Sequence, residues 1–352
     1  MALKGLSLAG LRCIERAELD PAPGRNLVIG NNASGKTSLL EAIFLLGRGR
    51  SFRAARREAM VRDGQDALRV VGKLKDGRSL GIEVTRSEWR ARAGGETVTQ
   101  LAELASLLPV QLLDPEVHRL VQEGPGERRR YLDWATFHVE QGFLEAWRAY
   151  QRALRQRNSA LRTRQPDAVL AVWEQGLAEH GELIDRYRRA TVEQLQPAVA
   201  AVGRRLLGGD LGLEYRAGQA EGQSLEAALA QHRERDRRIG MTQVGPHRAD
   251  LAVVLDAHRA RGWVSRGQQK LVAAAMVLGQ AQLLVRGWDD RAVLLVDDPA
   301  AELDPAHCAA LMEVITELPC QSFLTVLPGT ELPGLGEVRR FHVEQGRVEQ
   351  VV

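Results

Sequence analysis

The most informative stretch of this sequence is Gly30-Asn31-Asn32-Ala33-Ser34-Gly35-Lys36-Thr37. These residues match the pattern GxxxxGK[ST] at every fixed position. A short apolar strand at 26–29 precedes them, and helical periodicity from 36 to 46 follows. Such a turn directs successive backbone N–H groups at phosphate oxygens. The alternative is a glycine-rich turn that only caps a helix, and the strand and helix on either side favour nucleotide binding instead.

The motif's last two residues have separate tasks in this interpretation. Lys36 supplies a mobile positive charge for the β- and γ-phosphates, and Thr37 supplies a hydroxyl for Mg²⁺. The predicted nucleotide-binding residues are Gly30, Asn31, Asn32, Ala33, Ser34, Gly35, Lys36, Thr37 and Ser38.

The composition is that of a globular, soluble protein of one large or two ordinary domains. The chain has 352 residues, of which 44% are hydrophobic and 26% charged. The longest apolar run, 271–278, is too short to span a membrane, and we see no secretory signal. Three scattered cysteines, Cys13, Cys308 and Cys320, argue against a disulfide framework or a structural zinc site. We therefore expect a cytoplasmic protein without a membrane partner.

A second motif lies at the end of the apolar run 292–296. The run ends in Asp297-Asp298, and a P-loop needs a nearby carboxylate to complete its metal site. Asp297 is the predicted Mg²⁺ ligand together with Thr37. Asp298 would orient or deprotonate the attacking water, so we expect it to be catalytic together with Lys36. The alternative is a solvated acidic turn. Asp304, before Pro305, is expected to be a helix N-cap.

A third motif, Ser265-Arg266-Gly267-Gln268-Gln269-Lys270, opens a long helix. A serine and a glycine at a helix start form a second anion site. One chain has no use for two γ-phosphate sites around one nucleotide, but two chains facing each other do. We therefore predict that this helix start meets the nucleotide of a second copy. A plain N-cap at Ser265 is the alternative.

The overall pattern predicts an α/β fold with a helical insertion. Residues 1–113 and 240–352 carry β/α texture and form the predicted ATP-binding head. Residues 114–239 have apolar side chains at helical spacing and form the predicted insertion lobe, with an irregular interruption at 208–215. Further expected elements are a hairpin at 69–74 and 79–84, helices at 268–285 and 305–318, a strand at 322–326 and a closing hairpin around 345–346.

The three motifs, in this order, resemble an ABC-type P-loop ATPase head of the kind used in DNA repair and chromosome maintenance. Two further segments, PGERRRYLD at 125–133 and VGPHRADL at 244–251, make the chain similar to the RecF family of bacterial recombinational repair proteins. The similarity runs over the whole chain.

The resemblance implies ATP and Mg²⁺ as cofactors and an ATP-bound homodimer with weak ATPase activity. It also implies binding of double-stranded and gapped DNA, in replication, recombinational gap repair and the SOS response to DNA damage. RecR would be a partner, with RecO and RecA in the same pathway, and the protein would help to load RecA. Ser265, Arg266, Gly267 and Gln268 would reach the γ-phosphate held by the other subunit.

The chain departs from the usual pattern at three positions. Ala301 replaces a serine common after the acidic strand, Ala249 stands where a second acid is usual, and Thr325 lies near where transporters place a switch histidine. Gln111 is a candidate for the glutamine that senses the nucleotide in ABC-type heads. His247 and Arg248 would either contact nucleotide or brace the domain joint.

DNA affinity in such a protein should come mainly from phosphate contacts by arginines. The predicted DNA-binding residues are Arg53, Arg56, Arg57, Arg148 and Arg152, and wider candidates are Arg48, Arg50, Arg128 to Arg130 and Arg155. For any single arginine the alternative is a solvated face or an ion pair with a nearby acid.

Other classes of P-loop protein fit less well. A transporter ATPase subunit leaves the helical insertion unexplained, and a chromosome-maintenance head needs long heptad arms that are not visible. A small-molecule kinase has no use for the serine-led helix start. The remaining alternatives are an ATP-gated DNA-binding scaffold in which hydrolysis is incidental, and an ABC-type ATPase subunit of another system.

Overall fold

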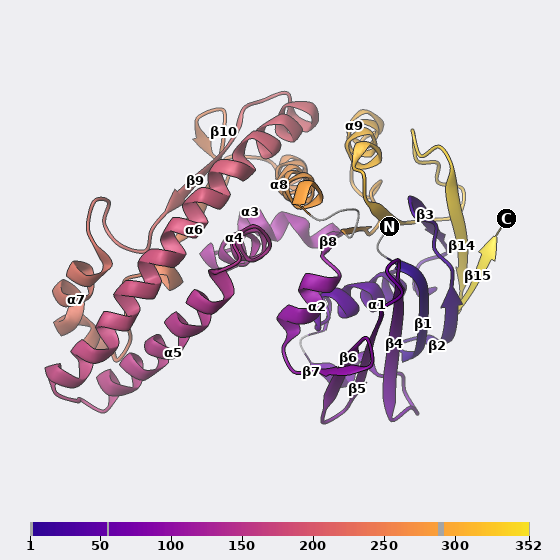
Figure 1. Ribbon diagram of the computed structural model, residues 1–352. Helices are drawn as coiled ribbons and strands as arrows, with labels where there is room; N and C mark the ends of the chain where they lie inside the picture. Colours follow the sequence, from indigo (N-terminus) through magenta and orange to yellow (C-terminus); the bar gives the residue numbers. More distant parts are fainter. Residues whose placement is uncertain (1–2, 55, 288–291, 352) are drawn as a thin grey trace. The chain divides into compact units, whose positions relative to one another are not determined.

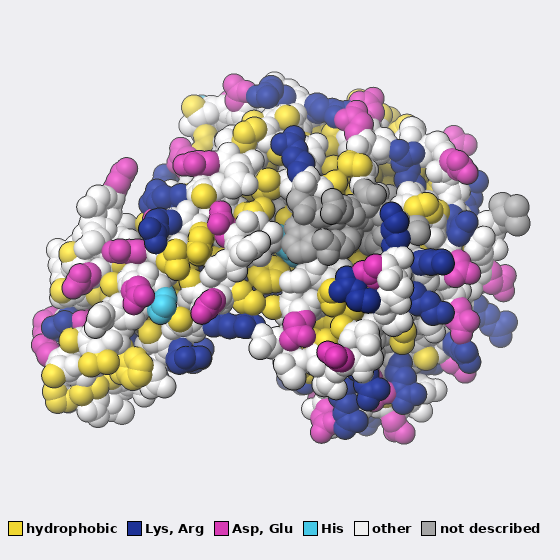
Figure 2. Space-filling model, in the orientation of Figure 1, with side chains coloured by type: hydrophobic (Ala, Val, Ile, Leu, Met, Phe, Trp, Pro, Cys, Tyr) yellow, Lys and Arg dark blue, Asp and Glu magenta, His cyan; other side chains and the backbone are white. Residues whose placement is uncertain are grey.

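The computed structural model describes residues 3–54, 56–287 and 292–351 (Figure 1). The chain divides into two compact units. The first contains residues up to Val117 and from Ala274 onward, and the second contains His118–Ala273. On the face drawn in Figure 2, basic and acidic side chains are interspersed. Within the described ranges, no helix is long and apolar enough to span a membrane.

The first unit is built on two six-stranded sheets. The antiparallel sheet has the order β2-β1-β4-β5-β6-β7. Its strands are β1 (Leu3–Leu11), β2 (Ile14–Leu19), β4 (Ala67–Leu74), β5 (Ser79–Thr85), β6 (Trp89–Ala93) and β7 (Glu96–Val98). The other sheet has the order β15-β14-β3-β13-β12-β8 and is parallel except for β15. Its strands are β3 (Arg25–Ile29), β8 (Val110–Leu113), β12 (Val293–Val296), β13 (Gln321–Val326), β14 (Val338–Glu344) and β15 (Arg347–Val351).

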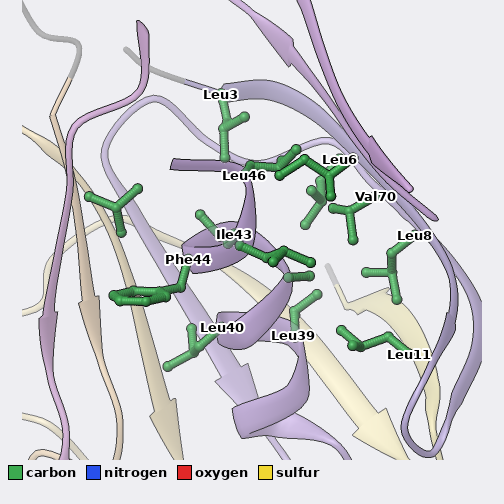
Figure 3. Close-up of a cluster of buried hydrophobic side chains, with 14 of the residues drawn as sticks. Leu3, Leu6, Leu8, Leu11, Leu39, Leu40, Ile43, Phe44, Leu46 and Val70 are labelled. Carbon is green, nitrogen blue, oxygen red and sulfur yellow. The ribbon is translucent and has the colours of Figure 1, made fainter. Parts of the chain in front are cut away.

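Helix α1 (Lys36–Arg48) lies at the centre of this unit's hydrophobic core. Its side chains are apolar on nearly all sides, which is the pattern of a fully buried helix. Figure 3 shows Leu39, Ile43 and Leu46 of α1 close to leucines of β1. The same cluster includes Phe323 of β13 and Phe341 of β14, so α1 joins the two sheets. Each fully buried leucine contributes about 1.5–3 kcal/mol.

Shorter elements complete the first unit. They are η1 (Arg57–Met60), α2 (Leu101–Leu107), η2 (Pro115–His118), which reaches the unit boundary, and α9 (Pro305–Glu317). The sequence predictions for the strand and helix around the P-loop, the β4–β5 hairpin, β12, β13 and the β14–β15 hairpin are confirmed. Asp304 caps α9 as expected, with its Oδ1 accepting from the His307 N–H at 3.0 Å.

The second unit is mostly helical, as the sequence predicted. Its helices are α3 (Arg119–Gln122), α4 (Pro125–Val139), α5 (Phe143–Arg162), α6 (Asp167–Leu207), α7 (Leu225–Ile239), η3 (Pro246–Arg248) and the start of α8 (Arg266–Gly287). Buried ion pairs join the helices, because a charge taken out of water needs a partner. Arg157 of α5 binds Glu174 of α6 and Asp236 of α7, and it is fully buried.

A small sheet of order β11-β10-β9 changes two details of the predicted organisation. Its strands are β9 (Leu211–Arg216), β10 (Asp250–Leu255) and β11 (His258–Arg259). The segment 208–215 was expected to be irregular, but it contains β9. Because β10 pairs antiparallel with β9, residues 240–273 are grouped with the helical unit, whereas the sequence placed them in the head.

Candidate nucleotide-binding site

The P-loop needs glycine at two positions for different reasons. A Cβ at Gly30 would lie 2.3 Å from the carbonyl oxygen of Val343, so no larger residue fits without a backbone shift. Gly35, the N-cap of α1, has φ +119°, which L side chains rarely adopt. No side chain caps this helix end. The first N–H groups of α1 therefore remain available to an anion.

The Lys36 side chain folds back onto the loop. Its Nζ donates to the carbonyl oxygens of Gly30, at 2.7 Å, and Asn31, at 2.9 Å. Burial lowers the Lys36 pKa, while Asp297 and Asp298 act to raise it. Lys36 therefore shares one electrostatic environment with both predicted acids, as the sequence motifs implied.

Thr37 and Asp297 lie side by side at the carboxyl edge of the parallel sheet. The Thr37 hydroxyl Oγ1 is 3.1 Å and 3.0 Å from the two Asp297 carboxylate oxygens. A hydroxyl and a carboxylate are the hard oxygen donors that Mg²⁺ prefers, and it fills its remaining positions with water and phosphate. The described residues contain no cluster of three or more His, Cys, Asp or Glu arranged for a metal. The donor set fits an ion held jointly with a nucleotide.

Thr325 holds both acids in place, a role that the sequence did not reveal. Strand β13 lies between β3 and β12, so Thr325 faces the acidic strand end. Its hydroxyl donates to Asp297 Oδ1 at 2.6 Å and accepts from the Asp298 backbone N–H at 2.9 Å. Asp298 has a left-handed backbone with φ +50°. The acidic pair is therefore anchored, which a freely solvated turn would not be.

Asp114 is a further acid beside this site, and the sequence analysis did not single it out. Leu113 of β8 pairs with Val296 of β12, so the residues that follow them, Asp114 and Asp297, are neighbours. Burial, with a further effect of Asp297 and Glu116, raises the Asp114 pKa to about 6. An acid directly after an apolar strand was the signal that could have found it.

A cavity of about 720 Å³ lies behind the loop, in the size range of small-molecule sites. Its lining is largely charged and consists of Cys13, Glu15, Arg16, Arg62, His342, Glu344, Gln345, Gly346, Arg347 and Glu349. Two of these residues contact the loop directly. Gly346 donates its N–H to the Ser34 carbonyl at 2.8 Å, and Cys13 Sγ lies 3.9 Å from the same oxygen.

The serine-led helix start, in the second unit, is exposed from Ser265 to Gln268. Ser265 Oγ accepts from the Gln268 N–H at 3.3 Å, and Gln268 Oε1 accepts from the Ser265 N–H at 3.0 Å. This reciprocal pair is a capping box, so the simple N-cap role of Ser265 is present. The cap uses the hydroxyl only as an acceptor. The Ser265 O–H therefore remains available to donate a hydrogen bond to an anion.

The VGPHRADL segment braces the second unit. The His247 Nε2–H donates to the Thr242 carbonyl at 3.0 Å, and Nδ1 lies 2.6 Å from the Tyr150 hydroxyl. Burial lowers the His247 pKa to about 4, so the ring is neutral near pH 7. These contacts all lie within the second unit, so they brace that unit and are not contacts at the domain joint. Arg248 is exposed and donates to the Gln243 side chain at 3.0 Å.

Several candidate basic residues are committed to internal contacts. Arg128 binds Asp250 at 2.9 Å and 3.1 Å, Arg129 donates to the Ala249 carbonyl at 2.7 Å, and Arg130 pairs with Glu127. Arg48 donates to the Val110 carbonyl at 3.0 Å. These arginines are therefore poor candidates for DNA contacts.

Six of the other candidates are free to bind an anion. Arg53, Arg56, Arg57, Arg148, Arg152 and Arg155 are exposed and make no ion pair within the described ranges. Arg148, Arg152 and Arg155 lie on one face of α5, at spacings of four and three. The candidate phosphate contacts are therefore this α5 stripe of Arg148, Arg152 and Arg155, and the cluster of Arg53, Arg56 and Arg57 after α1.

The structure also changes the interpretation of Gln111. Its side chain lies in β8, is 5% exposed, and donates to Gln280 Oε1 at 2.7 Å. A buried amide with a protein partner is not placed to sense a nucleotide. The sequence hypothesis for Gln111 is therefore not supported.

Known proteins are similar to this chain in both sequence and fold. Residues 2–332 match the RecF/RecN/SMC N-terminal domain family. The chain is 42% identical to the DNA replication and repair protein RecF of Stutzerimonas stutzeri, over 100% of this chain and 98% of that protein. It is also 42% identical to the same protein of Azotobacter vinelandii, over 99% of both. A solved structure of the recombination mediator protein RecF with ATP, of the RecFOR pathway, has a TM-score of 0.89 at 25% identity, covering 100% of this chain and 98% of that one. With its ABC-type ATPase head, the chain belongs to the RecF family of DNA replication and repair proteins.

Proposed function

We propose that this chain is an ATP-dependent DNA-binding repair protein with weak ATPase activity. The observation that carries the proposal is the convergence of Lys36, Thr37 and Asp297 beside a glycine loop at one sheet edge. The ATP-bound RecF structure, similar over its whole length, supports ATP as the nucleotide.

Each residue of the site has a defined task. The loop N–H groups and Lys36 bind the phosphates, and Lys36 leaves the loop carbonyls to do so. Thr37 and Asp297 would hold Mg²⁺, which neutralises phosphate charge when bound. Asp298, held by Thr325, orients the attacking water.

The proposal includes an ATP-dependent homodimer. Ser265 to Gln268 are exposed, and the Ser265 hydroxyl retains its proton for the γ-phosphate held by a second copy. Closing two ATP molecules between subunits would gate DNA binding. The DNA would be double-stranded or gapped, contacted by Arg53, Arg56, Arg57, Arg148 and Arg152. RecR would be the direct partner in a pathway with RecO and RecA, in the cytoplasm.

Two substitutions test the proposal. Lys36→Arg should weaken ATP binding and remove ATP-dependent dimerisation, because a planar guanidinium does not reproduce the compact ammonium charge of Lys36 beside the β- and γ-phosphates. Light scattering with and without ATP measures the dimer, and filter binding to gapped, duplex and single-stranded DNA measures the gating. A mutant that dimerises at wild-type concentrations would rule out the cross-subunit scheme.

Asp298→Asn separates an ATPase from an ATP-gated scaffold. In an ATPase the variant should hold the closed dimer on DNA, because water attack on ATP is slowed. In a scaffold it should release DNA and support repair as the wild type does.

A further inference from the structure

A stacked aromatic pair stands on the surface of the second unit. The rings of Trp263 and His258 have centroids 4.2 Å apart and planes inclined by 5°. Trp263 is nevertheless 64% exposed, more than most large apolar side chains of the described chain. An indole left largely in water, yet fixed against a second ring, is characteristic of a binding surface rather than of a core.

The backbone holds both rings. The turn between β10 and β11 contains Asp256 and Ala257, both with positive φ, and it places His258 at the strand start. The His258 Nδ1–H donates to the Asp256 carbonyl at 2.8 Å. On the other side, the backbone N–H of Trp263 donates to the Ala260 carbonyl at 3.2 Å, and the buried Val264 follows Trp263. The aromatic pair is therefore preorganised.

The surroundings of the pair are basic. Arg259, Arg261 and Arg266 are exposed and make no ion pair within the described residues. The nearby acids are engaged elsewhere, since Asp256 accepts from the Asp210 N–H and Asp250 is bound by Arg128. Stacked rings among unpaired arginines suit a ligand with a flat ring and negative charge, which is the chemistry of a nucleotide.

The sequence position of Trp263 indicates which nucleotide. It precedes Ser265 by two positions, so their Cα atoms are at most about 7 Å apart. A triphosphate whose γ-phosphate lies on the Ser265 helix start extends its nucleoside beyond the phosphates, within reach of an indole at that distance. We propose that Trp263 and His258 form a stacking platform for the nucleobase of the ATP held by a second copy of this chain. This inference rests on the proposed dimer and adds the base to the contacts made across it.

Trp263→Ala tests the platform, with Trp263→Phe as the conservative variant and Val172→Ala as a control at another exposed apolar side chain of the unit. Base stacking changes affinity on the order of 10-fold to 100-fold on alanine substitution. We expect Trp263→Ala to raise the protein concentration needed for ATP-dependent dimerisation by at least that factor, because a symmetric dimer with two ATP molecules loses two stacks. Trp263→Phe should dimerise at a concentration close to that of the wild type. Val172→Ala should dimerise at the wild-type concentration. Light scattering over a concentration series gives the values.

A second measurement asks whether the base is the contact. The wild type should dimerise better with ATP than with CTP or inorganic tripolyphosphate, and Trp263→Ala should lose that preference. If the wild type dimerises with ATP but Trp263→Ala keeps both the same midpoint and the same preference, the platform is wrong and the proposed dimer stands. If Trp263→Ala loses only single-stranded DNA binding, the platform binds DNA instead. If the wild type fails to dimerise with ATP, the proposed function itself fails.

Discussion

At the residue scale, His247 shows how burial and two hydrogen bonds select one protonation state. The Thr242 carbonyl oxygen can only accept, so Nε2 of His247 carries the proton and Nδ1 accepts from the Tyr150 hydroxyl. A second proton, on Nδ1 of His247, would remove the acceptor of the Tyr150 hydroxyl. It would also place a positive charge near Arg129 and Arg157. The neutral ring is therefore part of the second unit's stability.

The lowered pKa makes that stability sensitive to acid. The unfolded His247 takes up a proton as pH falls through about 6.5, while the folded residue does so only near 4. Stability is therefore present above pH 6.5 and is lost between 6.5 and 4, by at most roughly 3 kcal/mol. We expect His247→Gln to reduce this loss, and His180→Gln, in the same unit, to leave it unchanged. Urea unfolding at pH 7.5 and pH 4.5 measures both. Equal acid losses in all three proteins would contradict the argument.

At the element scale, β3 is flanked by two glycines, of which one has room for a Cβ and the other does not. Gly30 leads into the P-loop and approaches Val343 and Ser34 too closely for a Cβ, whereas a Cβ at Gly24 meets nothing within 4 Å. The turn after β3 is thus determined by the neighbouring strand β14 as well as by the phosphate. An apolar strand alone does not explain this close approach.

The two glycines make a matched pair of substitutions. Gly30→Ala should displace the loop, lower the free energy of unfolding by on the order of 1–3 kcal/mol and weaken ATP binding. Gly24→Ala should be neutral or slightly stabilising, because alanine narrows the unfolded ensemble. Urea unfolding and equilibrium ATP binding measure the two effects. Normal ATP binding by Gly30→Ala would show that the close contact is not needed.

At the scale of the whole molecule, the charge distribution bears on DNA binding. The net charge is only +3, and Figure 2 shows no single basic face in that view. In the proposed function, affinity for DNA therefore comes from particular unpaired arginines rather than from the overall field. The α5 stripe of Arg148, Arg152 and Arg155 is the most regular of these groups.

Reversing two charges of the stripe tests this. Arg148→Glu with Arg152→Glu should weaken ATP-dependent DNA binding and reduce the slope of log affinity against log salt by roughly 2, because two phosphate contacts are lost. Arg92→Glu with Arg340→Glu changes net charge equally at exposed, unpaired positions of the first unit and should have a smaller effect. Fluorescence anisotropy from low to high salt gives both slopes. The same slope in both double variants would assign the effect to net charge.

The sequence predicted the chemistry of the candidate site, because GxxxxGK[ST], the acidic strand end and the serine-led helix start are local patterns of residue types typical of phosphate and metal binding. It also predicted most helices and strands of the head, because each produces a short-range periodicity of apolar residues in the sequence. It did not reveal Thr325 or Asp114, or commit Arg128 to Asp250, because these roles depend on which strands become neighbours. It placed 240–273 in the head because β10 has the same apolar texture as a head strand. These points follow from strand pairing in the folded chain, because the pairs β9–β10 and β8–β12 bring together residues that are far apart in the sequence.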